Sequence, residues 1–234
     1  MTPPISHAEQ TKLEYDSFAP AYDSSHTKSP LRKLEYQLIR HALGPSLTGL
    51  TVLDLGGGSG VHARQALELG AASVDIIDIS PGMLQVAANA EKALGRERAM
   101  RFFEGDAAKS LAHLPLRGEG PGRFVGIRTS NPESSSARSG KYGVVLKEHR
   151  RIPGGVKFVV VVDGDPPVEF EAGCPDVLRS KGLEAKGLKP YKRFGLTEVE
   201  FMPFEAAAVV QRDPEFWKDY VEDPFAVVVR AVKM

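Results

Sequence analysis

Residues 51–114 carry the pattern that most limits how this chain can fold: short apolar segments alternate with segments of helical character. Each apolar segment ends in an acid or is followed by a glycine, and a helix comes next. The predicted strands are 51–55, 73–78 and 100–104, and the predicted helices are 61–69, 83–94 and 107–114. Strands that alternate with helices form parallel sheets with right-handed crossovers. We therefore predict an α/β fold, a Rossmann-like three-layer sandwich with a mostly parallel sheet.

The first turn of this pattern is Gly56-Gly-Gly-Ser-Gly60. A glycine turn between a strand and a helix lets a ligand approach the backbone, and the helix N-terminus offers free N–H groups. The match G-x-G-x-x-A at Gly58, Gly60 and Ala63 would suit a dinucleotide, but alone it is weak. Asp54 lies two residues before the turn and would repel a pyrophosphate. A ligand with an ammonium and a sulfonium would be attracted, so the charge favours S-adenosylmethionine over NAD.

Two further acids follow the next strands along the chain. Asp78 ends the second strand, 22 residues past Gly56, where a carboxylate can accept hydrogen bonds from both hydroxyls of a ribose. Asp106 follows the third strand, where a carboxylate can accept from the exocyclic amine of an adenine. Since open α/β sheets bind ligands at the carboxyl ends of their strands, these acids and Asp54 should lie along one edge.

With these motifs the sequence resembles the class I S-adenosylmethionine-dependent methyltransferases, in particular those acting on small molecules, many of them in secondary metabolism. The resemblance rests on the glycine turn with Asp54, on Asp78-Ile-Ser-Pro-Gly-Met83, on Gly105-Asp-Ala107 and on the segment 15–23, Tyr-Asp-Ser-Phe-Ala-Pro-Ala-Tyr-Asp. It implies that an N-terminal helix with tyrosines folds over the cofactor. The cofactor-binding residues that it implies are Tyr15, Tyr22, Asp54, Gly56, Gly57, Gly58, Gly60, Asp78, Ile79, Met83, Asp106 and Ala107.

By the same resemblance, the glycines and Asp54 would contact the methionine part of the cofactor. Asp78 would hold the ribose, Ile79 and Met83 would flank the adenine, and Asp106 with Ala107 would contact its amine. We assign no catalytic residue.

The whole chain is expected to form a single domain in three parts. Residues 1–48 would form a helical flap, with helices at 11–22 and 31–43, residues 49–130 the cofactor-binding half, and residues 131–234 the acceptor side. In the last part we expect a strand at 197–204, a hairpin of strands 156–162 and 168–171, an aromatic helix at 214–220 and a final strand at 225–232. Residues 131–140, rich in serine, are predicted to be a mobile surface loop.

The sequence departs from the family pattern after Asp106. Only 16 residues, 107–122, precede the strand predicted at 123–129, which is room for one helix and not for the further strand and helix that the family has there. We expect the strand 123–129 to lie beside 51–55, and the wall near the transferred methyl to be incomplete. Two functions therefore stay open: methyl transfer to a small organic acceptor at O, N or C, or an impaired relative that binds the cofactor or a partner without turnover.

Other features bound the chemistry. His149, Glu148 and His26 are candidate bases, although histidine and glutamate residues in such segments are more often ordinary surface residues. The six histidines lack metal-ligand spacing, and the single cysteine cannot form an internal disulfide, so we expect no metal site and a reducing compartment.

The composition limits the classes of partner that the protein is expected to bind. Thirty Lys and Arg balance thirty Asp and Glu, so no nucleic-acid footprint is expected. The longest apolar run, 158–162, is too short to cross a bilayer, and the first ten residues lack a signal-peptide pattern. These features predict a cytoplasmic protein that meets a small-molecule acceptor and no membrane. The oligomeric state is not indicated.

Overall fold

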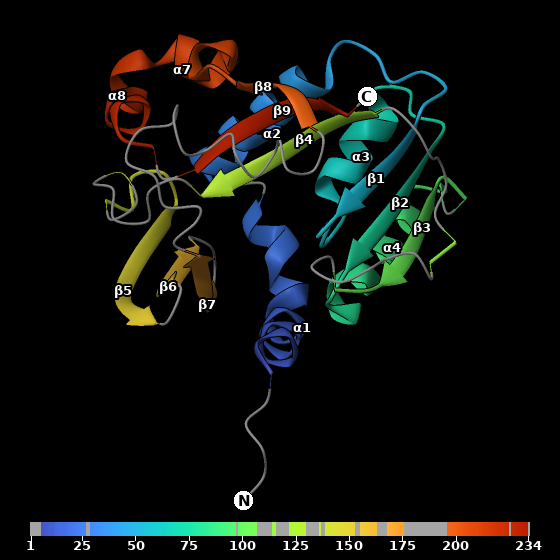
Figure 1. Cartoon of the computed structure of the whole chain (residues 1–234), viewed down its shortest axis with the longest axis horizontal. Helices are drawn as coiled ribbons and strands as arrows, with labels where there is room; N and C mark the ends of the chain where they lie inside the picture. The colour runs from blue at the N-terminus through green and yellow to red at the C-terminus, as the bar shows by residue number, and fades with distance from the viewer. Residues whose placement is uncertain are drawn as a thin grey trace, which may run out of the picture. The chain divides into compact units, whose positions relative to one another are not determined.

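The chain forms two compact units in the computed structural model (Figure 1). Unit 1 contains residues 1–24 and 44–119, and unit 2 contains residues 25–43 and 120–234. The structure describes residues 6–26, 29–96, 98–106, 114–115, 122–129, 136, 139–152, 155–162, 168–175, 196–224 and 226–233. The single domain in three parts stays a prediction, but the predicted flap 1–48 is divided between the two units.

Unit 1 contains a parallel three-stranded sheet in the order β1-β2-β3, which confirms the predicted strand–helix alternation. Its strands and the helices between them are β1 (Thr51–Leu55), α3 (Val61–Glu68), β2 (Ser73–Asp78), α4 (Pro81–Ala93) and β3 (Met100–Glu104). All six residues of β2 are buried, since neighbouring strands lie on both sides of it. Ser80 caps α4 as expected, because its Oγ accepts a hydrogen bond from the Met83 N–H at 3.0 Å and Pro81 takes the first helical position.

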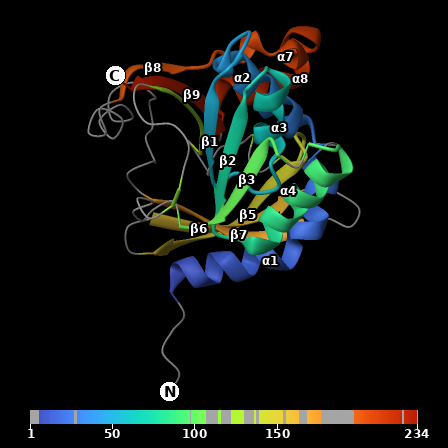
Figure 2. The same ribbon diagram turned by 90° about the vertical axis from the view of Figure 1, so that its right-hand side faces the viewer.

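The N-terminal helix α1 (His7–His26) belongs to unit 1 and is longer than predicted. It lies on the side of the sheet where β1, β2 and β3 end (Figure 2). Phe18 and Ala19 are its buried residues, whereas Leu13 is exposed. The predicted flap helix is therefore present at the carboxyl edge of the sheet.

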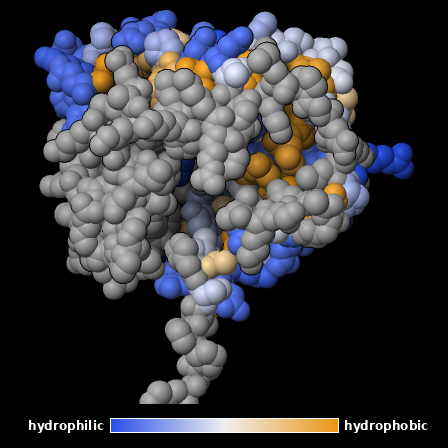
Figure 3. Space-filling model, viewed as in Figure 1, coloured by the Kyte–Doolittle hydropathy of each residue, from blue (hydrophilic) through white to orange (hydrophobic). Residues whose placement is uncertain are grey.

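β1 is an edge strand of this sheet within unit 1. Leu53 and Leu55 are 43% and 49% exposed, although inner strands of parallel sheets are buried on both faces. Figure 3 shows hydrophobic surface, in orange, in the part of the view where Figure 1 places β1. The expected pairing of 123–129 with 51–55 is not among the ladders of the described residues, where β1 pairs with β2 and β4 with β9.

No strand occurs among the described residues between β3 and β4, which are 105, 106, 114 and 115. The helix predicted at 107–114 lies almost entirely outside the described residues. The predicted lack of a further strand and helix between β3 and β4 stays a prediction, because residues 107–113 and 116–121 lie outside the described residues.

Unit 2 contains an antiparallel sheet in the order β4-β9-β8, with helices packed on it. Its elements are α2 (Pro30–Leu43), β4 (Gly122–Thr129), β8 (Leu196–Phe201), the 3₁₀ helix η2 (Phe204–Ala206), α7 (Ala208–Arg212), α8 (Pro214–Glu222) and β9 (Ala226–Lys233). Leu31, Leu34 and Leu38 of α2 share one face and are buried against this sheet and α7. That burial explains why α2 belongs to unit 2 while α1 belongs to unit 1.

A second antiparallel sheet in unit 2 has the order β5-β6-β7, formed by β5 (Val144–Ile152), β6 (Gly155–Val162) and β7 (Val168–Pro175). The predicted hairpin is confirmed in β6 and β7, although its turn at 163–167 is outside the described residues. β5 was not predicted, because the charged run 147–151 reads as a solvated surface segment. The register of β5 shifts between Lys147 and His149, which marks a bulge within that run.

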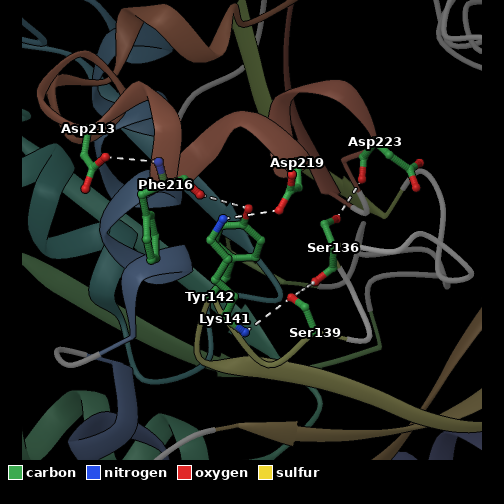
Figure 4. A network of polar contacts seen from close by, with 8 residues as sticks. All are labelled: Ser136, Ser139, Lys141, Tyr142, Asp213, Phe216, Asp219 and Asp223. Carbon is green, nitrogen blue, oxygen red and sulfur yellow. Dashed lines mark hydrogen bonds and ion pairs between the residues drawn. The ribbon is translucent and has the colours of Figure 1, made fainter.

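The serine-rich segment before β5 is tied to α8 (Figure 4). Ser136, which is buried, donates its hydroxyl to the carbonyl of Asp223 at 2.7 Å. Lys141 forms an ion pair with Asp219 at 3.2 Å, and the Tyr142 hydroxyl donates to the Phe216 carbonyl at 3.2 Å. The prediction of a mobile loop over 131–140 is therefore wrong at Ser136; most of the other residues of that segment lie outside the described ranges.

No helix in the described part of the chain has the length and apolar character needed to span a membrane.

Candidate functional site

The glycine turn adopts backbone conformations that require glycine at alternate positions. Gly56, Gly58 and Gly60 have φ angles of 69°, 52° and 78°, in the left-handed region that side chains disfavour. The backbone N–H groups of Gly56 and Gly57 donate to the carbonyl of Ile77 at 2.7 and 3.2 Å, which fastens the turn to the end of β2. The turn is thus a fixed backbone surface between β1 and α3.

Asp78 connects this turn to the beginning of α4. Its Oδ2 accepts a hydrogen bond from the Gly58 N–H at 2.9 Å, and its Oδ1 accepts from the Ser80 N–H at 2.8 Å. Burial raises the pKa of the Asp78 carboxyl, while the backbone N–H groups of Ser80, Gly58 and Ile79 oppose that shift. A carboxylate has about four lone-pair sites, so capacity for a further donor remains beside these backbone N–H groups.

Asp54 lies beneath the turn. A Cβ placed on Gly57 would come within 2.9 Å of Asp54 Oδ2, so the carboxylate is packed directly under the backbone there. Burial raises its pKa most strongly; His62 and a hydrogen bond from the Ala63 N–H lower it, and Asp78 raises it further. Oδ2 has no hydrogen-bond partner among the described residues.

A pocket of about 440 Å³ opens where the strands of unit 1 end. That volume is within the range of pockets that hold small molecules and cofactors. It is lined by Ala8, Thr11, Tyr15, Tyr22, Gly56, Gly58, Asp78, Ile79, Met83, Gly105 and Asp106. Residues from α1, from the glycine turn and from the ends of β2 and β3 therefore share one cavity within unit 1.

Eight of the twelve predicted cofactor-binding residues line this pocket: Tyr15, Tyr22, Gly56, Gly58, Asp78, Ile79, Met83 and Asp106. Asp54, Gly57 and Gly60 are described but are not among its lining residues, and Ala107 lies outside the described residues. Asp54 can thus act on a ligand through its charge from below the turn, rather than at the pocket surface.

Sequence reasoning missed three lining residues, Ala8, Thr11 and Gly105. Ala8 and Thr11 were recognisable by spacing, because positions 8, 11, 15 and 22 fall on one face of a helix. On this face Phe18 packs between the tyrosines, with ring centroids 5.0 Å from Tyr15 and 5.8 Å from Tyr22. The aromatic row makes α1 one wall of the pocket.

The candidate bases are not placed at this site. His149 and Glu148 lie on β5 and His26 ends α1, but their side chains lie outside the described part of the structure. Among the described residues, no group of three or more His, Cys, Asp or Glu side chains could hold a metal ion.

The raised pKa of Asp54 predicts a pH-dependent stability. A carboxyl whose pKa is higher in the folded state stabilises the fold below its ordinary value of 3.8 and loses that contribution as pH rises through the folded-state pKa. We expect Asp54→Asn, which is uncharged throughout, to gain unfolding free energy relative to wild type as pH rises. Urea unfolding between about pH 4 and pH 7 would measure this, with the exposed Glu68→Gln as control. If the unfolding free energy of Asp54→Asn fell relative to that of wild type as pH rises, the prediction would be contradicted.

Comparisons with known proteins agree with the α/β fold described above. Residues 52–120, less than a third of the chain, match the family model described as a methyltransferase domain. The solved structure of the [4+2]-cyclase SpnF is similar with a TM-score of 0.55 and 14% identity, over 98% of both chains. Magnesium protoporphyrin IX methyltransferase (ChlM) from Synechocystis, solved with bound SAM, is similar with a TM-score of 0.54 and 13% identity, over the full length of both. No curated protein matches the sequence.

Sequence identities of 14% and 13% establish that the fold is shared, and they establish nothing about the activity. One neighbour is a cyclase and the other a methyltransferase, so the same fold carries different activities. The function has to be argued from the site.

Proposed function

We propose that the chain binds S-adenosylmethionine in the pocket of unit 1 and transfers its methyl group to a small organic acceptor. Residues 52–120 match a methyltransferase domain, and the chain has the class I, Rossmann-like methyltransferase fold. The observation that carries the proposal is the position of Asp78. It is held between the glycine turn and α4, and it lines the pocket with acceptor capacity remaining. Hydroxyls of a ribose are suitable donors for such a carboxylate.

The charge of the site supports the choice of cofactor. Asp78 and Asp106 line the pocket and Asp54 lies beneath its floor, so the site is negative where a dinucleotide would place its pyrophosphate. Among the described residues that line it there is no lysine or arginine. A ligand with an ammonium and a sulfonium is attracted by this field, whereas a pyrophosphate is repelled.

The residues fit the parts of that cofactor as the resemblance implies. The backbone at Gly56 and Gly58 would face its methionine part, and Asp78 would accept from the ribose hydroxyls. Ile79 and Met83 supply apolar surface for the adenine, and Asp106 would accept from its amine. The bound cofactor supplies an activated methyl on a sulfonium, and the protein's part is to hold an acceptor in line with it and to exclude water.

The acceptor is proposed to be a small molecule methylated at O, N or C, as in secondary metabolism. The balanced composition supports this class over a nucleic acid, because it offers no excess of positive charge for phosphates. The single cysteine, which cannot form an internal disulfide, favours a reducing compartment, and we propose the cytoplasm.

A second candidate is a relative that binds the cofactor without methyl transfer. The observation that favours it is the short connection after Asp106, together with the edge position of β1 and the exposure of Leu53 and Leu55. The further strand and helix that the family has at this place would belong to the acceptor wall. The cyclase SpnF shows that this fold hosts activities other than methyl transfer.

Calorimetric titration tests the cofactor. We expect S-adenosylmethionine and its demethylated product to bind saturably at one site per chain, with Kd on the order of 1–100 μM, and NAD to give no saturable heat. Saturable NAD binding, or none by S-adenosylmethionine, would overturn the proposal. Transfer of a labelled methyl to any acceptor would then separate the enzyme from the binding protein.

A further inference from the structure

α1 presents two adjacent rows of residues to unit 1. One row, at positions 8, 11, 15 and 22, lines the pocket. The other row, at positions 12, 16 and 19, contacts the ends of β3 and α4 outside the pocket lining. Helix geometry places residues three and four apart on one face, so each row is continuous. The second row determines where the first one lies.

Asp16 is the central residue of the second row. Its Oδ1 accepts hydrogen bonds from the Ser80 hydroxyl at 2.6 Å and from the Gly82 N–H at 2.8 Å. The first-turn N–H groups of a helix have no partner within the helix. In α4, Pro81 has no N–H group, the Gly82 N–H donates to Asp16 and the Met83 N–H donates to Ser80. The cap of α4 is thus shared between its own residue Ser80 and a residue of α1. A carboxylate at this end is also favoured by the helix dipole.

We propose that Asp16 is a positioning residue for the cofactor: it fixes α1 on the N-terminus of α4, so that Tyr15 and Tyr22 stay in place as a wall of the pocket. The inference rests on the proposed function. Tyr15 directly precedes Asp16, and Ile79 and Met83, which line the pocket from the other side, flank the Ser80–Gly82 segment that Asp16 binds. The contact between Asp16 and the start of α4 therefore determines the distance between the pocket wall formed by α1 and the wall formed by Ile79 and Met83.

The packing around Gly82 shows that this contact is close. A Cβ on Gly82 would meet Asp16 Oδ1 at 2.9 Å, the Asp16 Cα at 3.2 Å and the Ala19 Cβ at 3.4 Å. Its φ is not in the left-handed region, so an alanine would suit the backbone, and the three atoms nearest to its Cβ all belong to α1. The ion pair between Lys12 and Glu104 attaches the same row to the end of β3.

α1 needs such an anchor because Pro20 lies inside it. Proline has no N–H, so the carbonyl of Asp16 loses the helical hydrogen bond that residue 20 would donate, and the proline ring crowds that carbonyl. In proteins, tertiary contacts supply most of the stability of a helix. The side chain of Asp16 makes its contacts at the turn where the helix itself is weakest.

The test compares Asp16→Ala with Asp16→Asn, and with Glu14→Ala as the matched control on the same helix. Glu14 accepts a hydrogen bond from Gln10 within α1. We expect Asp16→Ala to bind S-adenosylmethionine roughly tenfold more weakly, from two lost hydrogen bonds to a charged acceptor, with the loss mainly in the dissociation rate. Asn keeps an oxygen that can accept both bonds, so it should restore affinity to within about threefold. Glu14→Ala should bind like wild type.

Hydrogen exchange of the free proteins provides an independent readout. We expect the amides of α1 to exchange at least about tenfold faster in Asp16→Ala than in wild type and Glu14→Ala, because local opening becomes easier. If wild type bound no S-adenosylmethionine, the proposed function would fail, while this readout would still show whether Asp16 holds the helix.

Gly82→Ala gives a second variant in case Asp16→Ala fails to fold. It favours helix α4 by propensity but forces α1 away, so it should weaken cofactor binding while leaving the protein folded. Wild-type affinity in both Asp16→Ala and Gly82→Ala, or unchanged exchange of α1 in Asp16→Ala, would overturn the inference.

Discussion

Asp78→Ala is expected to bind S-adenosylmethionine about a hundredfold more weakly than wild type. Hydrogen bonds from two ribose hydroxyls to a carboxylate contribute roughly 1.5–3 kcal/mol each, and 1.4 kcal/mol corresponds to a factor of ten in affinity. The substitution also removes the acceptor of the Gly58 and Ser80 N–H groups, so the glycine turn and the start of α4 lose their common anchor. Calorimetry with S-adenosylmethionine and its demethylated product measures the effect.

Asp78→Asn and Glu68→Ala are the controls for that experiment. Asn keeps one acceptor oxygen and should lose less affinity than alanine, whereas Glu68 is an exposed residue of α3 outside the pocket lining and should bind like wild type. The product should be weakened as much as S-adenosylmethionine, because both carry the ribose. An Asp78→Ala protein that is folded and keeps wild-type affinity would remove the main support for the cofactor site.

The sheet of unit 1 could be predicted from the sequence because its signals are local. A short apolar segment with one acid, followed by a glycine turn, predicted β1, and Ser80 followed by Pro81 predicted the start of α4 with its cap. Asp78 and Asp106 follow successive strands, and the carboxyl ends of parallel strands share an edge, so they lie in one pocket. In such a unit, position along the chain determines position in space.

The positions that were missed depend on contacts distant in sequence. The contact from Asp16 to Ser80 spans 64 residues, and nothing near Asp16 indicates which helix it caps. β5 escaped prediction because the charged run that contains it lacks the alternation of a half-buried strand. The sequence shows that Asp54 is an acid next to the turn, but it does not tell on which side of the turn backbone the carboxylate lies.

Gly57→Ala is expected to destabilise the protein by about 2 kcal/mol, which lowers Tm by roughly 4–8 °C, and to weaken cofactor binding with it. The reason is packing and not backbone conformation, since Gly57, unlike its neighbours Gly56 and Gly58, has no left-handed φ. A Cβ there would meet Ile76 Cγ2 at 2.7 Å and Asp54 Cγ and Oδ2 at 2.9 Å. Both are held in strands of the sheet, so the turn would have to rise into the pocket. Thermal unfolding and calorimetry measure the two effects.

A double-substitution cycle with Ile76→Ala separates this packing mechanism from a general cost of losing a glycine. Ile76→Ala alone leaves a cavity under the turn and should cost roughly 2–5 kcal/mol, but it also removes the methyl that the new Cβ would meet. The double variant should therefore be less destabilised than the sum of the two single variants, by at least about 0.5 kcal/mol. Strict additivity would mean that the turn does not rest on Ile76. In that case the close packing of Asp54 and Ile76 beneath Gly57 could not be what fixes the height of the pocket floor.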